Sequence, residues 1–257
     1  MTGDDHMLAR DLAGQAGQRL LELRAQGGDP DVLRKAGDRL SHEFLTAALA
    51  RQRPGDAVLS EEGADNPARL GARRVWIVDP LDGTREFGEP GRSDWAVHVA
   101  LWEKGDVSGP GDLTAGAVAL PAQGTVLSTA EPPPGPPGDA APDRIRIVVS
   151  RSRPPSFVRN ISGLINAELV PLGSAGAKVA AVICGEVDAY VHGGGFYEWD
   201  TAAPVAVARA AGLHASRIDG SALAYNQADL LMPDILVCRP ALAGTLLRAI
   251  REVTHAP

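Results

Sequence analysis

The chain contains 257 residues, 44% hydrophobic and 22% charged, and carries a formal net charge of −7. This composition is ordinary for a globular protein. The acidic balance lacks the basic footprint of nucleic-acid-binding proteins, so we expect no nucleic-acid partner.

Neither the cysteines nor the hydropathy pattern points to a secreted or membrane-bound protein. Cys184 and Cys238 lie far apart without a C-x-x-C pair, which predicts neither a zinc site nor a disulfide framework. The N-terminus is polar and lacks a signal-peptide pattern. The longest apolar runs, such as residues 179–184, are too short to span a bilayer. We therefore expect a cytoplasmic protein with no membrane partner.

The first half of the chain predicts two helices followed by strands. Apolar residues at helical spacing indicate helices over residues 7–25 and 38–52, the first ended by a Gly-Gly-Asp-Pro sequence. Short apolar stretches bounded by turn residues indicate strands over 57–60, 75–78 and 95–102, and a pair of strands within 114–130.

A proline-rich segment, residues 132–138, marks the clearest change in composition. Because it suits neither a helix nor a central strand, we place a boundary there between an N-terminal α+β subdomain, 1–138, and a C-terminal α/β subdomain, 139–257. Strands and helices alternate in the second part, which indicates a layered arrangement. The predicted strands cover 144–149, 168–172, 189–191 and 235–238, and the predicted helices 155–165, 177–185, 201–211 and 242–253.

The strongest functional signal lies in residues 75–84, VWIVDPLDGT, where an apolar strand runs into a turn. Pro80 fixes its own φ and keeps Asp79 extended, and Gly83 lets the chain turn closely. This design directs Asp79, the Leu81 carbonyl and Asp82 to one point. Three hard oxygen donors suit Mg²⁺. The alternative is a plain turn built from ordinary turn residues.

Two further acidic residues extend this set. Glu61 follows a predicted strand, and Asp200 precedes a predicted helix. The alternatives are a solvated surface acid for Glu61 and a helix N-cap for Asp200. Two unit charges 4 Å apart repel by about 4 kcal/mol at an effective dielectric of 20. If these carboxylates meet, divalent metal is the natural compensation, and two ions sharing Asp79 would grip a phosphate ester and activate water.

Three motifs, in order along the chain, resemble signatures of the Mg²⁺-dependent, Li⁺-sensitive inositol monophosphatase superfamily. DPLDGT at 79–84 is similar to the first signature, WDTAA at 199–203 to the second, and SEE at 60–62 to the glutamate segment that precedes them. Finer matches resemble the CysQ-type 3′(2′),5′-bisphosphate nucleotidases, which act in sulfate assimilation. These matches are LSEE at 59–62, REF at 85–87, VSRS at 149–152 and EWDTAA at 198–203.

The resemblance implies a layered α-β-α-β-α sandwich, two or three Mg²⁺ ions per active site and a homodimer. Glu61, Asp79 and the Leu81 carbonyl would hold the first ion. Asp79, Asp82 and Asp200 would hold the second, and Glu61 a weaker third.

The resemblance also implies catalytic roles for Asp38, Thr84 and Glu61. The Thr84 hydroxyl, with a carboxylate partner, would orient the attacking water. The family carries a longer flap where this chain has only KAGD at 35–38, so we assign the partner role to Asp38. An N-cap is the alternative for Asp38.

A nucleotide bisphosphate carries about −3 to −4 charge, so an acidic protein must supply local cations. Lysine is rare here, and the resemblance places Lys178 near the nucleotide. Ser150, Arg151 and Ser152 follow a predicted strand and could meet the 5′-phosphate or adenine, although Arg151 alone could be a surface charge. The full set of predicted substrate contacts is Asp82, Gly83, Thr84, Ser150, Arg151, Ser152, Gly173, Ser174, Lys178 and Asp200.

The resemblance implies a Mg²⁺-dependent phosphatase that converts 3′-phosphoadenosine 5′-phosphate to AMP and phosphate. One alternative is inositol monophosphatase or fructose-1,6-bisphosphatase activity. A second is a catalytically dead nucleotide or metal sensor, which the shortened flap favours.

Overall fold

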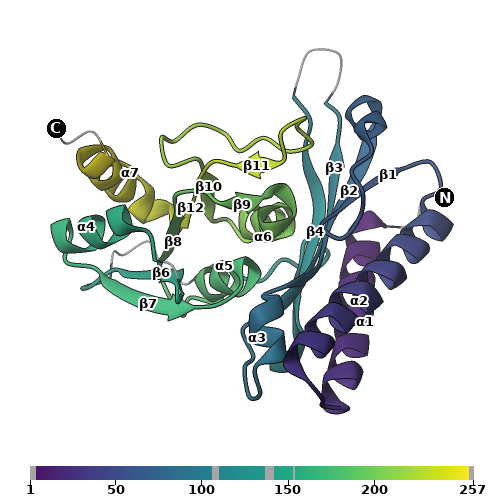
Figure 1. Cartoon of the computed structure of the whole chain (residues 1–257). Coiled ribbons are helices and arrows are strands. Elements are labelled where there is room, and N and C mark those ends of the chain that lie inside the picture. Colours follow the sequence, from purple (N-terminus) through teal and green to yellow (C-terminus); the bar gives the residue numbers. More distant parts are fainter. Residues whose placement is uncertain (1–3, 106–109, 137–141, 153, 255–257) are drawn as a thin grey trace.

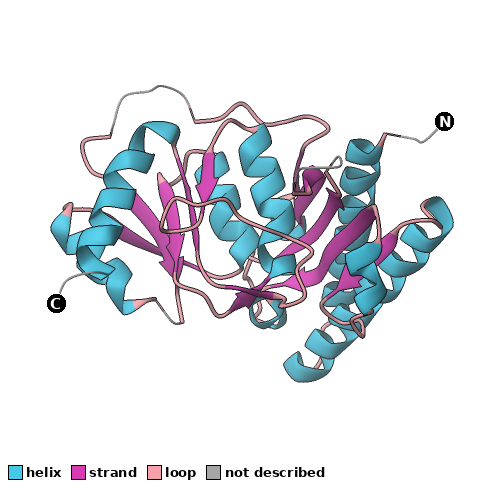
Figure 2. Ribbon diagram, turned by 90° about the horizontal axis from the view of Figure 1, so that it is seen from above, coloured by secondary structure: helices cyan, strands magenta, loops and turns pink. Residues whose placement is uncertain are grey.

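The computed structural model describes residues 4–105, 110–136, 142–152 and 154–254. Two five-stranded β-sheets and three layers of helices alternate through the molecule, and a small two-stranded sheet pairs β9 with β11 (Figure 1). Helices α1 and α2 cover the outer face of the first sheet, α5 and α6 lie between the sheets, and α4 and α7 cover the outer face of the second. Figure 2 shows the same layers from above. The predicted α-β-α-β-α fold class is confirmed.

The first sheet has five strands in the order β1-β2-β3-β4-β5, with β1 parallel to β2 and the other pairs antiparallel. Its elements correspond to those predicted, apart from short 3₁₀ turns and one short helix that carry little periodic signal. They are α1 (Asp5–Ala25), α2 (Pro30–Gln52), β1 (Ala57–Ser60), β2 (Arg74–Asp82), α3 (Thr84–Gly88), β3 (Ala96–Glu103), β4 (Asp112–Leu120) and β5 (Thr125–Ser128).

Helix α2 begins two turns earlier than the expected start at residue 38. The Asp29 side chain accepts hydrogen bonds from the backbone N–H groups of Asp31 and Val32, and Pro30 occupies the first helical turn. This is a strong helix start that the preceding glycines obscured. Asp38 therefore lies inside the helix, and the alternative reading of Asp38 as an N-cap is wrong.

The second sheet has the order β10-β12-β8-β6-β7, with β6 parallel to both neighbours. The predicted strands and helices of this half are present, whereas β9, β10 and β11 were missed because two or three residues show no periodicity. The elements are β6 (Arg146–Ser150), α4 (Ser156–Leu164), β7 (Glu168–Leu172), α5 (Ala175–Ile183), β8 (Ala189–His192), β9 (Phe196–Tyr197), α6 (Glu198–Ala210), β10 (His214–Ser216), β11 (Leu231–Met232), β12 (Ile235–Cys238) and α7 (Pro240–Thr254).

Helix α6 is buried on nearly all sides, as expected for a helix packed between two layers. It contacts β2, β3 and β4 of the first sheet although it belongs to the second half of the chain. This packing brings its first turn against the end of β2. The functional site therefore lies where the two halves of the chain meet.

The described part of the proline-rich segment, 132–136, lies outside any helix or strand, as predicted, and residues 137 and 138 lie outside the described ranges. The subdomain boundary near residue 138 stays a prediction. Among the helices of the described residues, none is both long and apolar enough to cross a membrane.

Candidate functional site

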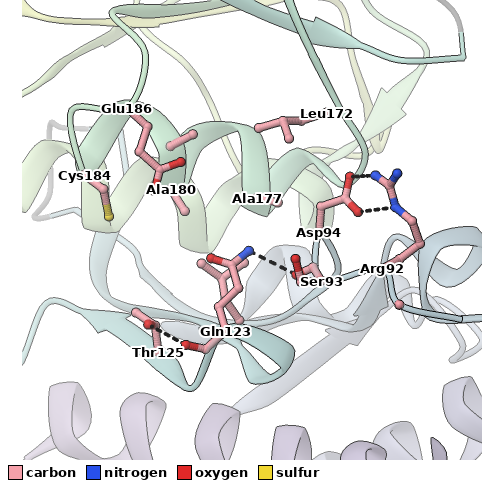
Figure 3. Close-up of a pocket in the computed structure, with 13 residues that line it drawn as sticks. Arg92, Ser93, Asp94, Gln123, Thr125, Leu172, Ala177, Ala180, Cys184 and Glu186 are labelled. Atoms are coloured by element: carbon pink, nitrogen blue, oxygen red, sulfur yellow. Dashed lines mark hydrogen bonds and ion pairs between the residues drawn. The ribbon is translucent and has the colours of Figure 1, made fainter.

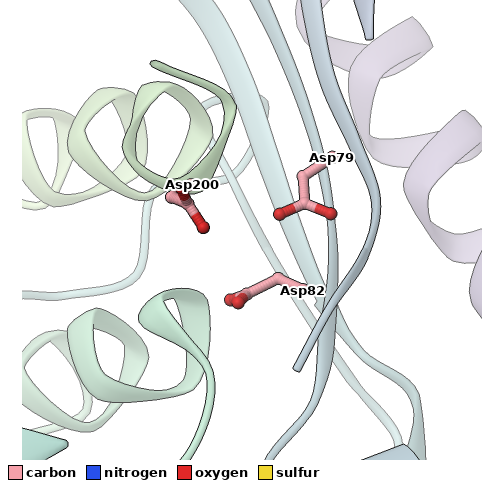
Figure 4. Close-up of side chains that lie close together, drawn as sticks. All are labelled: Asp79, Asp82 and Asp200. Carbon is pink, nitrogen blue, oxygen red and sulfur yellow. The ribbon is translucent and has the colours of Figure 1, made fainter. Parts of the chain in front are cut away.

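Three aspartates from distant parts of the chain converge between the two sheets (Figure 4). Asp79 and Asp82 come from the end of β2, and Asp200 comes from the first turn of α6. One carboxylate oxygen from each lies within 4.8 Å of the others. Both β2 aspartates are buried, so their charges repel in a poorly solvated place. Clustered hard oxygen donors of this kind fit a small divalent cation.

The turn after β2 presents these groups because its backbone leaves the regular strand. Pairing with β3 shifts register between Asp79 and Asp82, and Asp79 Oδ1 accepts the backbone N–H of Leu81 at 3.0 Å. Gly83 has φ of +82°, and a Cβ there would lie 3.0 Å from Ser174 Cβ. Glycine is therefore required where the turn approaches the second half of the chain.

Asp82 also ties the turn to the start of α5. Its carboxylate accepts the Ser174 hydroxyl at 2.5 Å and the Gly176 backbone N–H at 2.6 Å. Burial alone raises the pKa of Asp82, but bonding to His98 and the charge of Lys178 outweigh it and hold the pKa to about 2. Asp82 is thus kept ionised.

His98, on β3, is a site residue that sequence analysis missed. It is fully buried, with Nε2 3.3 Å from Asp82 Oδ2 and Nδ1 3.1 Å from the Trp199 carbonyl. Its backbone pairs with that of Asp79. A polar residue inside the apolar run AVHVALW was the available signal.

Glu61 follows β1, whose last residue pairs with Val78, so the chain places it beside Asp79. The residue as a whole is exposed, but its carboxyl group lies close to that of Asp79. Desolvation of the Glu61 carboxyl group and the charges of Asp200 and Asp82 raise its pKa to about 7.

Desolvation, followed by repulsion between the acids, also raises the pKa of Asp200 to about 6 and that of Asp79 well above its ordinary value.

Asp200 is held by its own helix. Its Oδ2 accepts the backbone N–H of Tyr197 at 2.6 Å, and it occupies the third helical position of α6. It is therefore a capping-box partner and not the N-cap, which corrects the alternative reading. The neighbouring Glu198 is fully buried and accepts the backbone N–H groups of Asn226 and Gln227, each at 2.7 Å.

Asp38 and Thr84, 46 residues apart, meet across the site. The Thr84 Oγ1 atom lies 3.3 Å from Asp38 Oδ1 and 3.0 Å from the Leu81 carbonyl oxygen. Burial, and then the charge of Glu62, raise the pKa of Asp38 to about 6. A hydroxyl is therefore positioned between a carboxylate and the acidic turn.

A cavity of about 600 Å³ adjoins this turn. Eight of the ten predicted substrate contacts line it, the exceptions being Asp82 and Asp200. Among the described residues around it, three cationic side chains face one acidic side chain, which is unusual in a chain of net charge −7. The lining residues are Gly83, Thr84, Arg85, Glu86, Ser150, Arg151, Ser152, Gly173, Ser174 and Lys178.

Two of the cations in this wall are held by the protein itself. Lys178 Nζ lies 2.7 Å from the Ser174 carbonyl oxygen and 3.2 Å from that of Gly173, so it fixes the turn before α5. Arg151 is paired with Asp94 and, at 3.4 Å, with Glu86. Arg151 is thus part of a charged cluster and not a lone surface charge.

The known proteins that this chain resembles in sequence are phosphatases. A model of the inositol monophosphatase family matches residues 9–255. The 3′-phosphoadenosine 5′-phosphate phosphatase of Mycobacterium leprae is 51% identical over 255 residues, covering 97% of this chain and 94% of the relative.

Two solved structures share the fold. Inositol monophosphatase II of Staphylococcus aureus has a TM-score of 0.81 at 22% identity, covering 96% of this chain and 95% of that chain. CysQ of Bacteroides thetaiotaomicron has a TM-score of 0.77 at 29% identity, covering 91% of this chain and 97% of that chain.

Proposed function

Because the chain belongs to the inositol monophosphatase family and is a phosphomonoesterase, we propose that it converts 3′-phosphoadenosine 5′-phosphate to AMP and inorganic phosphate. The observation that carries this proposal is the cationic cavity beside the carboxylate cluster. The cluster suits one phosphate with its metal, and the cavity suits a second anionic group. The identity to a phosphatase of this nucleotide supports the same substrate.

We assign Mg²⁺ as the cofactor, with two or three ions per site, because every proposed donor is a hard oxygen. Glu61, Asp79 and the Leu81 carbonyl would hold one ion, Asp79, Asp82 and Asp200 a second, and Glu61 a weaker third. Bound divalent cations supply two things: they lower the pKa of water and neutralise charge on the phosphate.

The chain's own groups orient the reacting water. The Thr84 hydroxyl is near enough to donate to Asp38, which leaves its lone pairs to accept a hydrogen bond from water. Asp38, ionised above its pKa of about 6, would take up the proton that the attacking water releases through the Thr84 hydroxyl. Such general-base help typically raises the reaction rate 10²–10⁴-fold. Glu61 would assist in activating this water.

The remaining contacts would bind the nucleotide. Gly83 and Thr84 start α3 beside the cluster, where the phosphate being cleaved would lie. Ser150, Arg151 and Ser152 also line the cavity and would meet the 5′-phosphate or the adenine. Gly173, Ser174 and Lys178 would form the wall next to the sugar.

A substrate panel tests the proposal. At equal concentrations and with Mg²⁺ titrated, we expect the nucleotide bisphosphate to be hydrolysed faster than inositol 1-phosphate or fructose 1,6-bisphosphate. Li⁺ should inhibit the reaction, and a chelator should abolish it. Faster turnover of either sugar phosphate would overturn the substrate assignment, and activity indifferent to chelation would overturn the metal assignment.

We also propose that the protein forms a homodimer, lies in the cytoplasm and acts in sulfate assimilation. The family resemblance supports all three. Light scattering of the purified chain tests the first. Fractionation tests the second, and growth of a deletion strain with and without reduced sulfur tests the third.

A further inference from the structure

A buried carboxylate, Asp94, connects three segments around the substrate cavity. Its residue exposure is 5%, and it lies just before β3. Oδ1 accepts Arg92 Nε at 2.8 Å, and Oδ2 accepts the Gly173 backbone N–H at 2.7 Å. The same Oδ2 accepts the Arg151 guanidinium. Figure 3 shows the Arg92–Asp94 pair at the edge of a second cavity, of about 510 Å³.

We propose that Asp94 gives this enzyme its preference for a nucleotide with a second phosphate, by fixing the Arg151 guanidinium in the cavity wall. This inference rests on the proposed function and adds a positioning residue that acts on the 5′-phosphate through Arg151. Neither Asp94 nor Arg92 belongs to the metal cluster or to the Asp38–Thr84 pair.

The geometry leaves Arg151 able to bind a ligand while held in place. A guanidinium carries five N–H donors. In its contacts with other described residues, Arg151 uses Nη2, which donates to Asp94, and Nη1, which donates to Glu86. The Arg151 side chain is 31% exposed, so its remaining donors can reach a phosphate. A long side chain already ordered by a buried partner loses less freedom on binding, which favours affinity.

The proposal predicts a selective effect of Asp94→Asn. The amide retains an oxygen for the Gly173 N–H but removes the charge that holds Arg151. The KM for 3′-phosphoadenosine 5′-phosphate should rise about tenfold, the scale of one lost charge-assisted hydrogen bond, with kcat within twofold of the wild type. The kinetic constants for adenosine 3′-monophosphate, which lacks the 5′-phosphate, should stay within twofold.

Two further measurements separate positioning from general damage. Inhibition by AMP, which keeps the 5′-phosphate, should weaken by the same factor as the KM. Arg151→Ala alone should reproduce the loss, and adding Asp94→Asn to it should cost nothing further, because one contact is removed twice. Arg151→Ala also tests whether Arg151 binds the 5′-phosphate while leaving the buried Asp94 unchanged.

Asp234→Asn is the matched control. Asp234 is a buried carboxylate, 7% exposed, that binds Arg217 and the Ile218 backbone N–H and does not line the cavity. The Asp234→Asn substitution should lower the stability of the protein about as much as Asp94→Asn does, without changing the substrate preference.

An equal loss on both nucleotides, unchanged AMP inhibition or additive effects of the two substitutions would overturn the proposal. Absence of bisphosphate hydrolysis by the wild-type protein would instead overturn the proposed function.

Discussion

Asp79 combines burial with surrounding negative charge. It is 1% exposed, and its carboxylate faces the charges of Glu61, Asp82 and Asp200. Such an arrangement costs stability unless a cation is present, and residues of this kind are characteristic of functional sites. Neutralising Asp79 should therefore lower the activity but raise the stability of the metal-free protein.

Asp79→Asn should lower kcat/KM at least ~100-fold, equivalent to roughly 2.7 kcal/mol of transition-state stabilisation, because it removes the carboxylate shared by the proposed metal sites. It should also raise the Tm of the metal-free protein by removing one repelling charge. Kinetics and calorimetry check both. Asp188→Asn, which removes a buried carboxylate bonded to Arg146 outside the site, should lower Tm and spare kcat/KM. Activity of Asp79→Asn within tenfold of the wild type would contradict the role.

The metal-free protein should lose stability as pH rises from about 5 to about 8. Burial and mutual repulsion raise the pKa of Asp38 and Asp200 to about 6 and that of Glu61 to about 7, above the values near 4 of an unfolded chain. The folded state thus holds protons that the unfolded chain has released, and this stabilisation disappears as pH passes through the raised pKa values.

Calorimetry in a chelator at constant ionic strength measures this slope. Asp200→Asn should flatten it, and saturating Mg²⁺ should abolish it. A Tm that is constant or rising across this range would show that the carboxylates do not repel one another as the structure implies.

At the scale of elements, the start of α5 is packed directly against β3. A Cβ on Gly176 would lie 2.1 Å from His98 Nε2, while the Gly176 N–H donates to Asp82. This contact leaves no room for a side chain between the helix and the acidic cluster.

Gly176→Ala should therefore destabilise the protein by about 1–3 kcal/mol, the usual range for overpacking, and should raise the Mg²⁺ concentration needed for half-maximal activity. Gly163→Ala is the control, since it lies in α4 with nothing within 4 Å of the added Cβ, and should stabilise by about 0.5–1 kcal/mol. Denaturant unfolding of both variants checks the contrast. Equal stability of the two would refute the close packing.

Sequence reasoning located most long elements and the acidic residues because both depend on local patterns. The strands β1, β7 and β12 were predicted at their observed bounds, since short apolar runs between turn residues define them. The start of α2 was missed because two glycines concealed a strong cap.

Sequence reasoning missed the site residues that are defined by tertiary contacts. His98 and Asp94 acquire their partners from residues up to 101 positions away, and no local pattern encodes such pairs. The roles that sequence resemblance assigned to the site residues stay predictions for the experiments above.

At the scale of the whole molecule, the carboxylate cluster bridges the two halves of the chain. Asp79 and Asp82 belong to the first sheet, and Asp200 to a helix from the second half. A cation bound by all three would therefore favour only the folded state, in which the halves are docked.

Mg²⁺ should accordingly raise Tm in a concentration-dependent way. At 100 times its Kd, a bound ion increases the free energy of unfolding by about 2.7 kcal/mol. Asp200→Asn should reduce this gain, whereas Asp234→Asn should leave it unchanged. Thermal scans across a Mg²⁺ series measure the effect. A Tm insensitive to Mg²⁺ in the wild type would mean that no cation bridges the halves.

The order of the ligands along the chain has a consequence for biosynthesis. Residue 200 leaves the ribosome long after residues 79 and 82, so a nascent polypeptide cannot assemble the complete cluster until α6 has emerged. Chains arrested before that point should gain no protease resistance from added magnesium, whereas released full-length chains should gain it. The ion would thus stabilise the fold only after α6 has emerged.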